Sequence, residues 1–165
     1  MNQEMVDTQK LFLSWLAGFI DGEGTISITR KNPQTMNRTY HKTYRAYLSI
    51  ANTSGEIMNL IQENLSSMAG RSIGTLGEYG GKNPKHKRYY LFSVNKMLDL
   101  VWVLRTVQPY LILKKSQAEM VISFLSSREE KLGKKHFGSD ITANEIKIFD
   151  NIRILNKRGA SCQQN

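Results

Sequence analysis

The chain has 165 residues, which suits one domain with a single core and is short for two ordinary domains. Lysine and arginine number 23 against 14 aspartate and glutamate, and the resulting formal net charge of +9 favours a polyanionic partner. Its longest apolar run, around residues 11–20, is too short to span a bilayer, and the first ten residues lack a signal or transit-peptide pattern. Because Cys162 is the only cysteine, an intrachain disulfide and a cysteine-based zinc site are excluded. We therefore expect a soluble intracellular protein without a membrane partner, and the compartment, an organelle among the alternatives, stays open.

The first predicted element is a helix that Asp7 or Thr8 caps and that runs to about Asp21. Gly18 and Gly22 lie one turn apart in this helix and therefore share a face. Each glycine inside a helix costs roughly 1 kcal/mol relative to alanine. A pair on one stripe therefore favours the close approach of another backbone.

Two carboxylates, Asp21 and Glu23, stand at the end of this helix. The carboxyl end of a helix carries partial negative charge, so acidic residues are unfavourable there unless a cation offsets them. Together with the paired glycines, this pattern favours a packed helix pair that presents carboxylates to a metal ion.

The next segments predict a β-hairpin, with strands at residues 25–31 and 42–52 and a polar tip at residues 32–39. Apolar residues alternate along both strands and are expected to face the core: Ile26, Ile28, Ala46, Leu48 and Ile50. The opposite face is rich in hydroxyl groups and positive charge.

A capping box from Thr53 to Glu56 predicts a second helix that stops at Gly70. Its expected core stripe is Ile57, Leu60, Ile61, Leu65 and Met68. A second hairpin follows, with strands at about residues 72–79 and 88–94 and a basic loop at residues 80–87. The sequence does not decide which residues of this hairpin face the core, because apolar and polar residues do not alternate cleanly from Tyr89 to Phe92.

Three further helices are predicted after the second hairpin. The first begins after a cap at Asn95, with Leu98, Val101, Trp102 and Arg105 at helical spacing. The second follows Pro109 and carries Ala118, Val121, Ile122 and Leu125. After a long loop at residues 126–141, a capping box from Thr142 to Glu145 opens the last helix, with an apolar stripe of Ile148, Phe149, Ile152 and Leu155. We expect one domain over residues 1–158 and a flexible tail at residues 159–165, because the chain from Asn156 onward has little to pack against.

The nonapeptide Leu16–Gly24, LAGFIDGEG, closely resembles the signature of the LAGLIDADG homing endonucleases. The resemblance implies an α+β fold with an αββαββα core, a saddle-shaped antiparallel sheet and, here, additional C-terminal helices. In this family two signature helices pack together and their last acidic residues bind divalent metal over the DNA minor groove. Because the chain holds one copy, it resembles the single-motif branch, which implies a homodimer through the helix of Leu11–Gly24. The interface residues would be Trp15, Gly18, Phe19 and Gly22.

The resemblance also implies site residues. Glu23, helped by the Gly22 carbonyl, would hold Mg²⁺, and Ca²⁺ would support binding without cleavage. Asp21 would be mainly structural. The segment from Gln108 to Ala118 resembles the family stretch that supplies a catalytic lysine, which Lys114 matches. Asn52 corresponds to a polar residue that holds solvent near the metal. Without the motif, Glu23 and Lys114 would be surface charges and Asn52 a strand-ending turn residue.

The two hairpins would form the DNA-binding surface, with base-edge and phosphate contacts from both strands and both loops. The expected contact residues are Ser27, Thr29, Lys31, Arg38, Arg45, Tyr47, Ser49, Lys82, Lys85, Lys87 and Arg88. The alternative is a solvated sheet face, which is normal for an antiparallel sheet.

The sequence thus predicts an intron-encoded homing endonuclease that hydrolyses phosphodiester bonds of double-stranded DNA at a long, nearly palindromic site, with magnesium as cofactor. The alternative is an intron RNA maturase or a non-catalytic DNA-binding protein on the same fold. The target sequence cannot be deduced from the chain.

Overall fold

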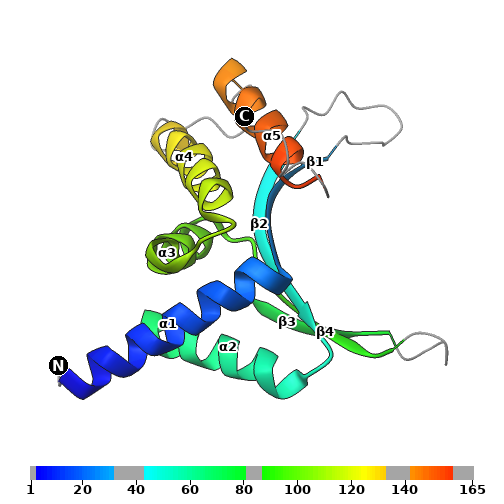
Figure 1. Ribbon diagram of the computed structural model, residues 1–165. Coiled ribbons are helices and arrows are strands. Elements are labelled where there is room, and N and C mark those ends of the chain that lie inside the picture. The colour runs from blue at the N-terminus through cyan, green and yellow to red at the C-terminus, as the bar shows by residue number, and fades with distance from the viewer. Residues whose placement is uncertain (1–2, 32–42, 81–86, 133–141, 158–165) are drawn as a thin grey trace, which may run out of the picture.

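The computed structural model describes residues 3–31, 43–80, 87–132 and 142–157 (Figure 1). Its elements confirm the predicted α+β order and run along the chain as α1 (Gln3–Glu23), β1 (Gly24–Lys31), β2 (Thr43–Asn52), α2 (Gly55–Ala69), β3 (Thr75–Tyr79), β4 (Tyr89–Val94), α3 (Met97–Val107), the 3-10 turn η1 (Gln108–Tyr110), α4 (Lys115–Leu132) and α5 (Ala143–Leu155).

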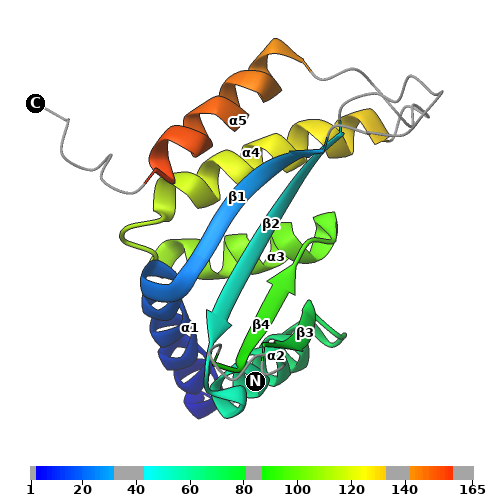
Figure 2. The same ribbon diagram turned by 90° about the vertical axis from the view of Figure 1, so that its right-hand side faces the viewer.

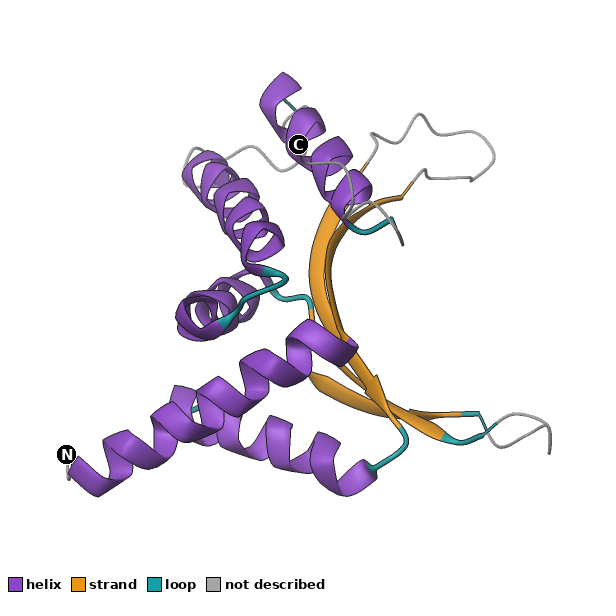
Figure 3. Cartoon of the chain, in the orientation of Figure 1, coloured by secondary structure: helices purple, strands orange, loops and turns teal. Residues whose placement is uncertain are grey.

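The four strands form one antiparallel sheet in the order β1-β2-β4-β3. Each hairpin pairs its own strands, and β2 joins β4 in a register that runs from Leu48↔Val94 to Asn52↔Tyr90. The sheet is curved, and the helices lie on one side of it (Figure 3). Figure 2 shows the other side, where the strands lie in front of the helices. We call this second side the free face.

The core lies between the sheet and the helices. The alternating residues predicted to point inward in β1 and β2 are all buried, together with Leu16 and Ile20 of α1. Phe92 and Val94 of β4 are buried as well, whereas Leu91 and Ser93 are only partly buried. This pattern resolves the facing of the second hairpin: alternate residues of β4 point to the core, and Leu91 and Ser93 belong to the free face.

Helix α1 is longer than predicted at both ends. It begins at Gln3, so the predicted caps Asp7 and Thr8 lie inside it, where Asp7 forms an ion pair with Lys10 at 3.9 Å. It also continues through Gly22 to Glu23. A glycine costs a helix only about 1 kcal/mol, which burial of the helix's apolar stripe offsets.

The capping box predicted at Thr53 is wrong by one residue. Ser54 is the N-cap of α2, and its hydroxyl accepts the Ile57 N–H at 3.3 Å. The buried stripe also differs from the prediction, since Met58 is buried and Leu60 is 46% exposed. It ends at Gly70 as predicted, with φ of 63° in the left-handed region that glycine favours.

The boundaries of α3 and α4 also differ from the prediction. The cap position of α3 is Lys96 rather than Asn95, without a side-chain cap bond, and Leu98 is 64% exposed. Helix α4 runs to Leu132, so the first part of the predicted loop at residues 126–141 is helical, and residues 133–141 lie outside the described ranges.

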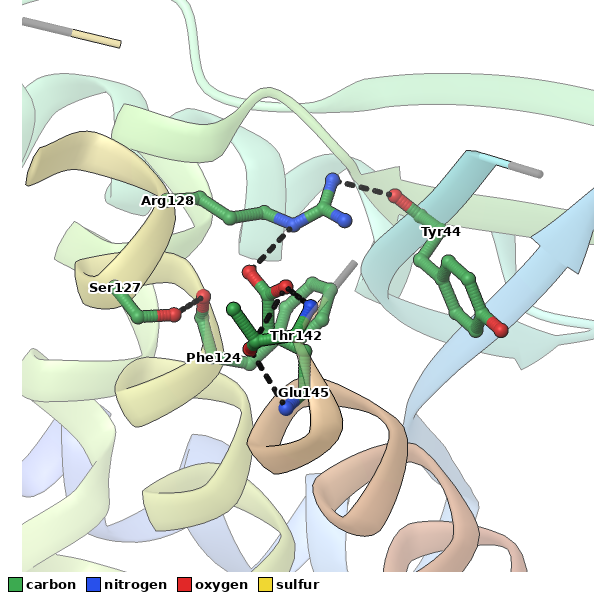
Figure 4. A network of polar contacts seen from close by, with 6 residues as sticks. All are labelled: Tyr44, Phe124, Ser127, Arg128, Thr142 and Glu145. Carbon is green, nitrogen blue, oxygen red and sulfur yellow. Dashed lines mark hydrogen bonds and ion pairs between the residues drawn. The ribbon is translucent and has the colours of Figure 1, made fainter. Parts of the chain in front are cut away.

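A buried polar network attaches α5 to α4 and to the sheet (Figure 4). The carboxylate of Glu145, 1% exposed, forms an ion pair with Arg128 Nε at 3.4 Å and accepts the Thr142 N–H at 2.7 Å. Arg128 also donates to the Tyr44 carbonyl at 3.4 Å and lies over the Phe124 ring. This confirms the capping box predicted at Thr142 and shows that Arg128, which follows the apolar stripe of α4, pairs with α5.

The first residue after α5 is exposed but bonded to the sheet, contrary to the expectation for the tail. The Asn156 side-chain amide donates to the Ile26 carbonyl of β1 at 2.9 Å. The predicted flexible segment at residues 159–165 lies outside the described residues.

Candidate active site at the end of helix α1

Two residues connect the end of α1 to the start of α4. The Lys114 ammonium donates to the Ile20 carbonyl at 3.0 Å and to the Asp21 carbonyl, so it satisfies carbonyl groups in the last turn of α1. In return, the Asp21 carboxylate accepts the backbone N–H groups of Ile112, Leu113 and Lys114, at 2.8, 3.1 and 2.9 Å. The structural role expected for Asp21 thus has a specific form, since this carboxylate caps the segment that leads into α4.

Partial burial lowers the pKa of Lys114 below its ordinary value of 10.5, while the negative charges of Asp21 and Glu23 oppose this shift. An ammonium group has three donors, and two of them are used on α1. Lys114 therefore keeps one donor and a positive charge at the same helix end as Glu23.

Glu23 is the last residue of α1 and is exposed. Within the described residues its carboxylate has no hydrogen-bond or ion-pair partner, and no group of three or more His, Cys, Asp and Glu gathers into a metal-binding cluster. The Gly22 carbonyl is among the last four of α1, which lack partners within the helix. One chain therefore offers one free carboxylate and a nearby carbonyl, the oxygen ligands that Mg²⁺ and Ca²⁺ prefer.

Asn52 ends β2 on the same side of the sheet as Ile50, the partner of Gly24, which follows Glu23 directly. Two residues of strand place Asn52 about 7 Å beyond that pair. Its side-chain oxygen accepts the Ser54 N–H at 2.8 Å. This is the strand-ending turn that the sequence left open as an alternative, and the role near a metal stays a prediction.

Helix α1 exposes an apolar stripe that leads to this site. Leu11 is 73% exposed and Trp15 42%, and Gly18 and Gly22 continue the same face. The Trp15 ring stacks on Phe19, with 5.4 Å between centroids. A Cβ atom built on either glycine would meet nothing within 4 Å, so neither glycine is required by packing within the chain.

The residues predicted to bind DNA lie mainly on the free face. Cross-strand pairing brings together Ser27 with Tyr47 and Thr29 with Arg45, and Thr25 pairs with Ser49. Residues directly opposite in antiparallel strands share a face. Lys31 belongs to the same face by register, since it pairs with Thr43.

The predicted contacts in the loops are less uniform. Lys87 is exposed just before β4, and Arg88 forms an ion pair with Glu78 at 3.0 Å. The backbone partner of Glu78 is Tyr90, so Glu78 is on the side of the sheet that carries Phe92. The remaining predicted residues, Arg38, Lys82 and Lys85, lie outside the described residues.

The strands of the second hairpin, whose facing the sequence left open, contribute six further residues to the free face. Its residues there follow from the register of β4 with β2 and β3: Thr75, Gly77, Tyr79, Tyr89, Leu91 and Ser93. In the sequence, the alternation of apolar and polar residues around Phe92 and Val94 indicates which residues face the core, but the adjacent Tyr89 and Tyr90 interrupt this pattern.

Several solved homing endonuclease structures share this fold. I-CvuI in complex with its target in the presence of Ca is 21% identical, with a TM-score of 0.66, and the match covers 91% of this chain and 85% of that one. An archaeal intron-encoded homing endonuclease complexed with DNA is 20% identical, with a TM-score of 0.66 and coverage of 92% and 87%. I-SmaMI bound to uncleaved DNA with calcium is 14% identical, with a TM-score of 0.63, but there the match covers 88% of this chain and 45% of that one.

A search of curated protein sequences found no significant match. Within the described residues, no helix is both long enough and apolar enough to cross a membrane. The family model described as LAGLIDADG endonuclease matches residues 16–117, from the first residue of the nonapeptide to just beyond Lys114. The match therefore includes α1 from Leu16 onward, the whole sheet and the reciprocal contacts between Asp21 and Lys114. The chain belongs to the LAGLIDADG endonuclease family.

Proposed function

We propose that this protein is a homodimeric, sequence-specific homing endonuclease that uses a divalent metal ion to hydrolyse one phosphodiester bond in each strand of a long, nearly palindromic DNA site. The observation that carries the proposal is the end of α1. There the Glu23 carboxylate, which has no partner among the described residues, lies beside the Lys114 ammonium group. Both groups are at the end of an exposed apolar helix face.

The residues at this helix end fit a divalent metal ion. Mg²⁺ retains several waters and needs only one or two protein carboxylates. Glu23 and the Gly22 carbonyl from each of two chains would meet that requirement without any further cluster of acidic residues. When bound, the ion supplies positive charge beside the phosphate and lowers the pKa of water.

Lys114 contributes a fixed positive charge to the same site. Its two bonds to the last carbonyls of α1 hold the ammonium in place, and its remaining N–H can be donated to a phosphate oxygen. A held cation stabilises the negative charge that develops during phosphoryl transfer without reorganising first. This supports an electrostatic role for Lys114 rather than a role in proton transfer.

The dimer is supported by the exposed stripe of α1. Gly18 and Gly22 leave room for a second backbone, and Leu11 and Trp15 offer apolar surface for it to cover. The lengths of similar structures also support a dimer. This chain spans 85% of I-CvuI but only 45% of I-SmaMI, so it corresponds to about one half of that larger protein. A twofold axis beside α1 would bring two Glu23 carboxylates together and present one free face to each half-site.

The free face is the surface that we assign to DNA. It carries Arg45 and Lys31 with many hydroxyl groups, and the formal net charge of the chain is +9. Its two-stranded ribbons suit the major groove, whose base edges arginine and lysine distinguish by hydrogen bonds. DNA-bound forms of similar folds, such as I-CvuI with its target, add support.

The experiment starts with selection of cleaved sites from a random-sequence DNA library, followed by a comparison of Glu23→Gln with wild type. The variant should bind the selected duplex in Ca²⁺ with unchanged affinity and lose cleavage in Mg²⁺, because the amide is a poor metal ligand. Glu63→Gln, at another exposed helix position, is the matched control and should cut normally. Undiminished cleavage by Glu23→Gln would reject the metal assignment.

The same preparation tests the alternatives. A maturase would bind its host intron RNA in preference to duplex DNA, and a non-catalytic regulator would bind duplex without cutting it in Mg²⁺. Either result with wild-type protein would reject the endonuclease proposal.

A further inference from the structure

The free face is chemically divided along the sheet. Toward the tip of the first hairpin it carries Thr29, Lys31 and Arg45. The middle carries hydroxyl groups, because Ser49 is the partner of both Thr25 and Ser93. Beyond them, toward the tip of the second hairpin, the partners become apolar and aromatic.

We define the apolar end of the free face by its five residues: Ala51, Gly77, Tyr79, Tyr89 and Leu91. Leu91 of β4 is the partner of Ala51 on one side and of Gly77 on the other. The Tyr79 and Tyr89 rings stack with 5.6 Å between centroids and are 47% and 39% exposed. Because a Cβ atom on Gly77 would lie 2.8 Å from the Tyr79 ring, that ring lies over the strand rather than extending away from it.

This apolar end is not part of the core. The helices occupy the opposite side of the sheet (Figure 1), and β4 already supplies Phe92 and Val94 to them. The solvated face of an antiparallel sheet is usually polar, as the rest of this face is. An apolar row here therefore indicates a surface that is covered when the protein acts.

The ligand that covers this apolar end can be inferred because the apolar end is continuous with the rest of the free face. Under the proposed function, on which this inference rests, the same face lies in the major groove of DNA. Base edges in that groove offer hydrogen-bond donors and acceptors and one apolar group, the C5-methyl group of thymine. Leu91 and Ala51 have no hydrogen-bonding side chain, so the methyl group is the feature that they can recognise.

We propose that the apolar end of the free face recognises thymine methyl groups in one block of each half-site, and that Leu91 is the principal specificity-determining residue there. Arg45 and its neighbours recognise a different block by hydrogen bonds. The two hairpins therefore divide each half-site between two kinds of readout.

The test replaces thymine by uracil, which lacks only the methyl group, one block at a time in the selected target. Binding is measured in Ca²⁺. In one block, wild-type protein should bind the uracil duplex about fourfold more weakly for each methyl group lost. This is the change in affinity expected when one buried methyl group is removed. The selected sites should also be enriched in A·T pairs at that block. Uracil in the block that Arg45 contacts should change affinity little.

Protein variants assign the effect to residues. Leu91→Ala should abolish the sensitivity to uracil in that block, and the milder Ala51→Ser should reduce it. The matched control Arg45→Ala should weaken binding overall but keep that sensitivity. Sensitivity that persists in Leu91→Ala, or that is missing from every block in wild type, would overturn the inference while leaving DNA cleavage, and hence the proposed function, intact. Concentration-dependent self-association that Leu91→Ala abolishes, without any effect of uracil, would assign the surface to a second copy instead.

Discussion

Asp21 and Lys114 each cap the helix end to which the other is attached. The Asp21 carboxylate at the end of α1 accepts the three N–H groups of residues 112–114, just before α4, and the Lys114 ammonium donates to carbonyls at the end of α1. Each side chain thereby neutralises the partial charge of the opposite helix end. These polar bonds fix the helix that carries Glu23 to the helix that follows Lys114.

Asp21→Ala should therefore destabilise the protein. Three N–H groups would lose their acceptor and would have to turn to water, which we expect to reduce the free energy of unfolding by about 1–2 kcal/mol. Urea unfolding measures the change. Glu23→Ala is the control, because Glu23 has no partner among the described residues and should change stability by less than about 0.5 kcal/mol. Equal losses in the two variants would contradict the capping role.

Stability should depend on pH through Lys114. Burial lowers its pKa in the folded state, so between that lowered value and 10.5 the unfolded state binds more protons. Protonated Lys114 therefore destabilises the folded state below the lowered pKa, and this destabilisation is relieved as pH rises to 10.5. The stability of wild type relative to Lys114→Met should therefore increase with pH over this window, as measured by urea unfolding.

The direct check is an NMR titration of the lysine side chains. Lys114 should titrate below 10.5, and Glu23→Gln should lower its midpoint further, because the Glu23 charge favours the protonated form. A midpoint that rises in Glu23→Gln would show that the two groups do not interact as described.

Gly18→Ala separates packing within the chain from packing between chains. Nothing in the chain lies within 4 Å of the added Cβ atom, and removing a helix glycine should stabilise the isolated chain by about 0.5–1 kcal/mol. If a second α1 approaches here, the same methyl group should weaken association. Sedimentation equilibrium should thus give a weaker dimer with Gly18→Ala than with Asn59→Ala, an exposed helix control on α2. An unchanged dimer would place the interface elsewhere.

Arg128→Met should strongly destabilise the α4–α5 pair. It removes the Arg128 cation from the buried Glu145 carboxylate, and we expect a loss of about 3 kcal/mol, the lower end of the usual range because Arg128 is 28% exposed. Combining it with Glu145→Gln should restore part of the loss, since the buried group is then neutral. Lys147→Met, an exposed cation on α5, is the control for thermal unfolding and should leave the melting temperature nearly unchanged.

The sequence predicted the first hairpin well for a physical reason. Along β1 and β2 one face is buried and the other is not, so Ile26, Leu48 and Ile50 alternate with polar residues and the register is strongly specified. In β4 the free face is itself partly apolar. Alternation therefore disappears from the sequence although it persists in the structure.

The errors have a common cause in contacts between distant residues. The Asp21 carboxylate accepts N–H groups 91 to 93 residues away, and Arg128 of α4 forms an ion pair with Glu145 of the next helix. Such partners leave no trace in local periodicity. The cap of α2 shows the same limit at short range, since the choice between Thr53 and Ser54 depends on the turn that Asn52 makes.

The bond between Asn156 and Ile26 joins residues 130 positions apart. It has a consequence for synthesis on the ribosome, where the chain emerges from its N-terminus. Strand β1 is an edge of the sheet, and helix α5, which contacts it, is made after all four described strands. Until residue 156 has emerged, the edge remains open to pairing with other chains. Shortening this protein before Asn156 should therefore lower its yield through aggregation before it alters any chemistry at Glu23.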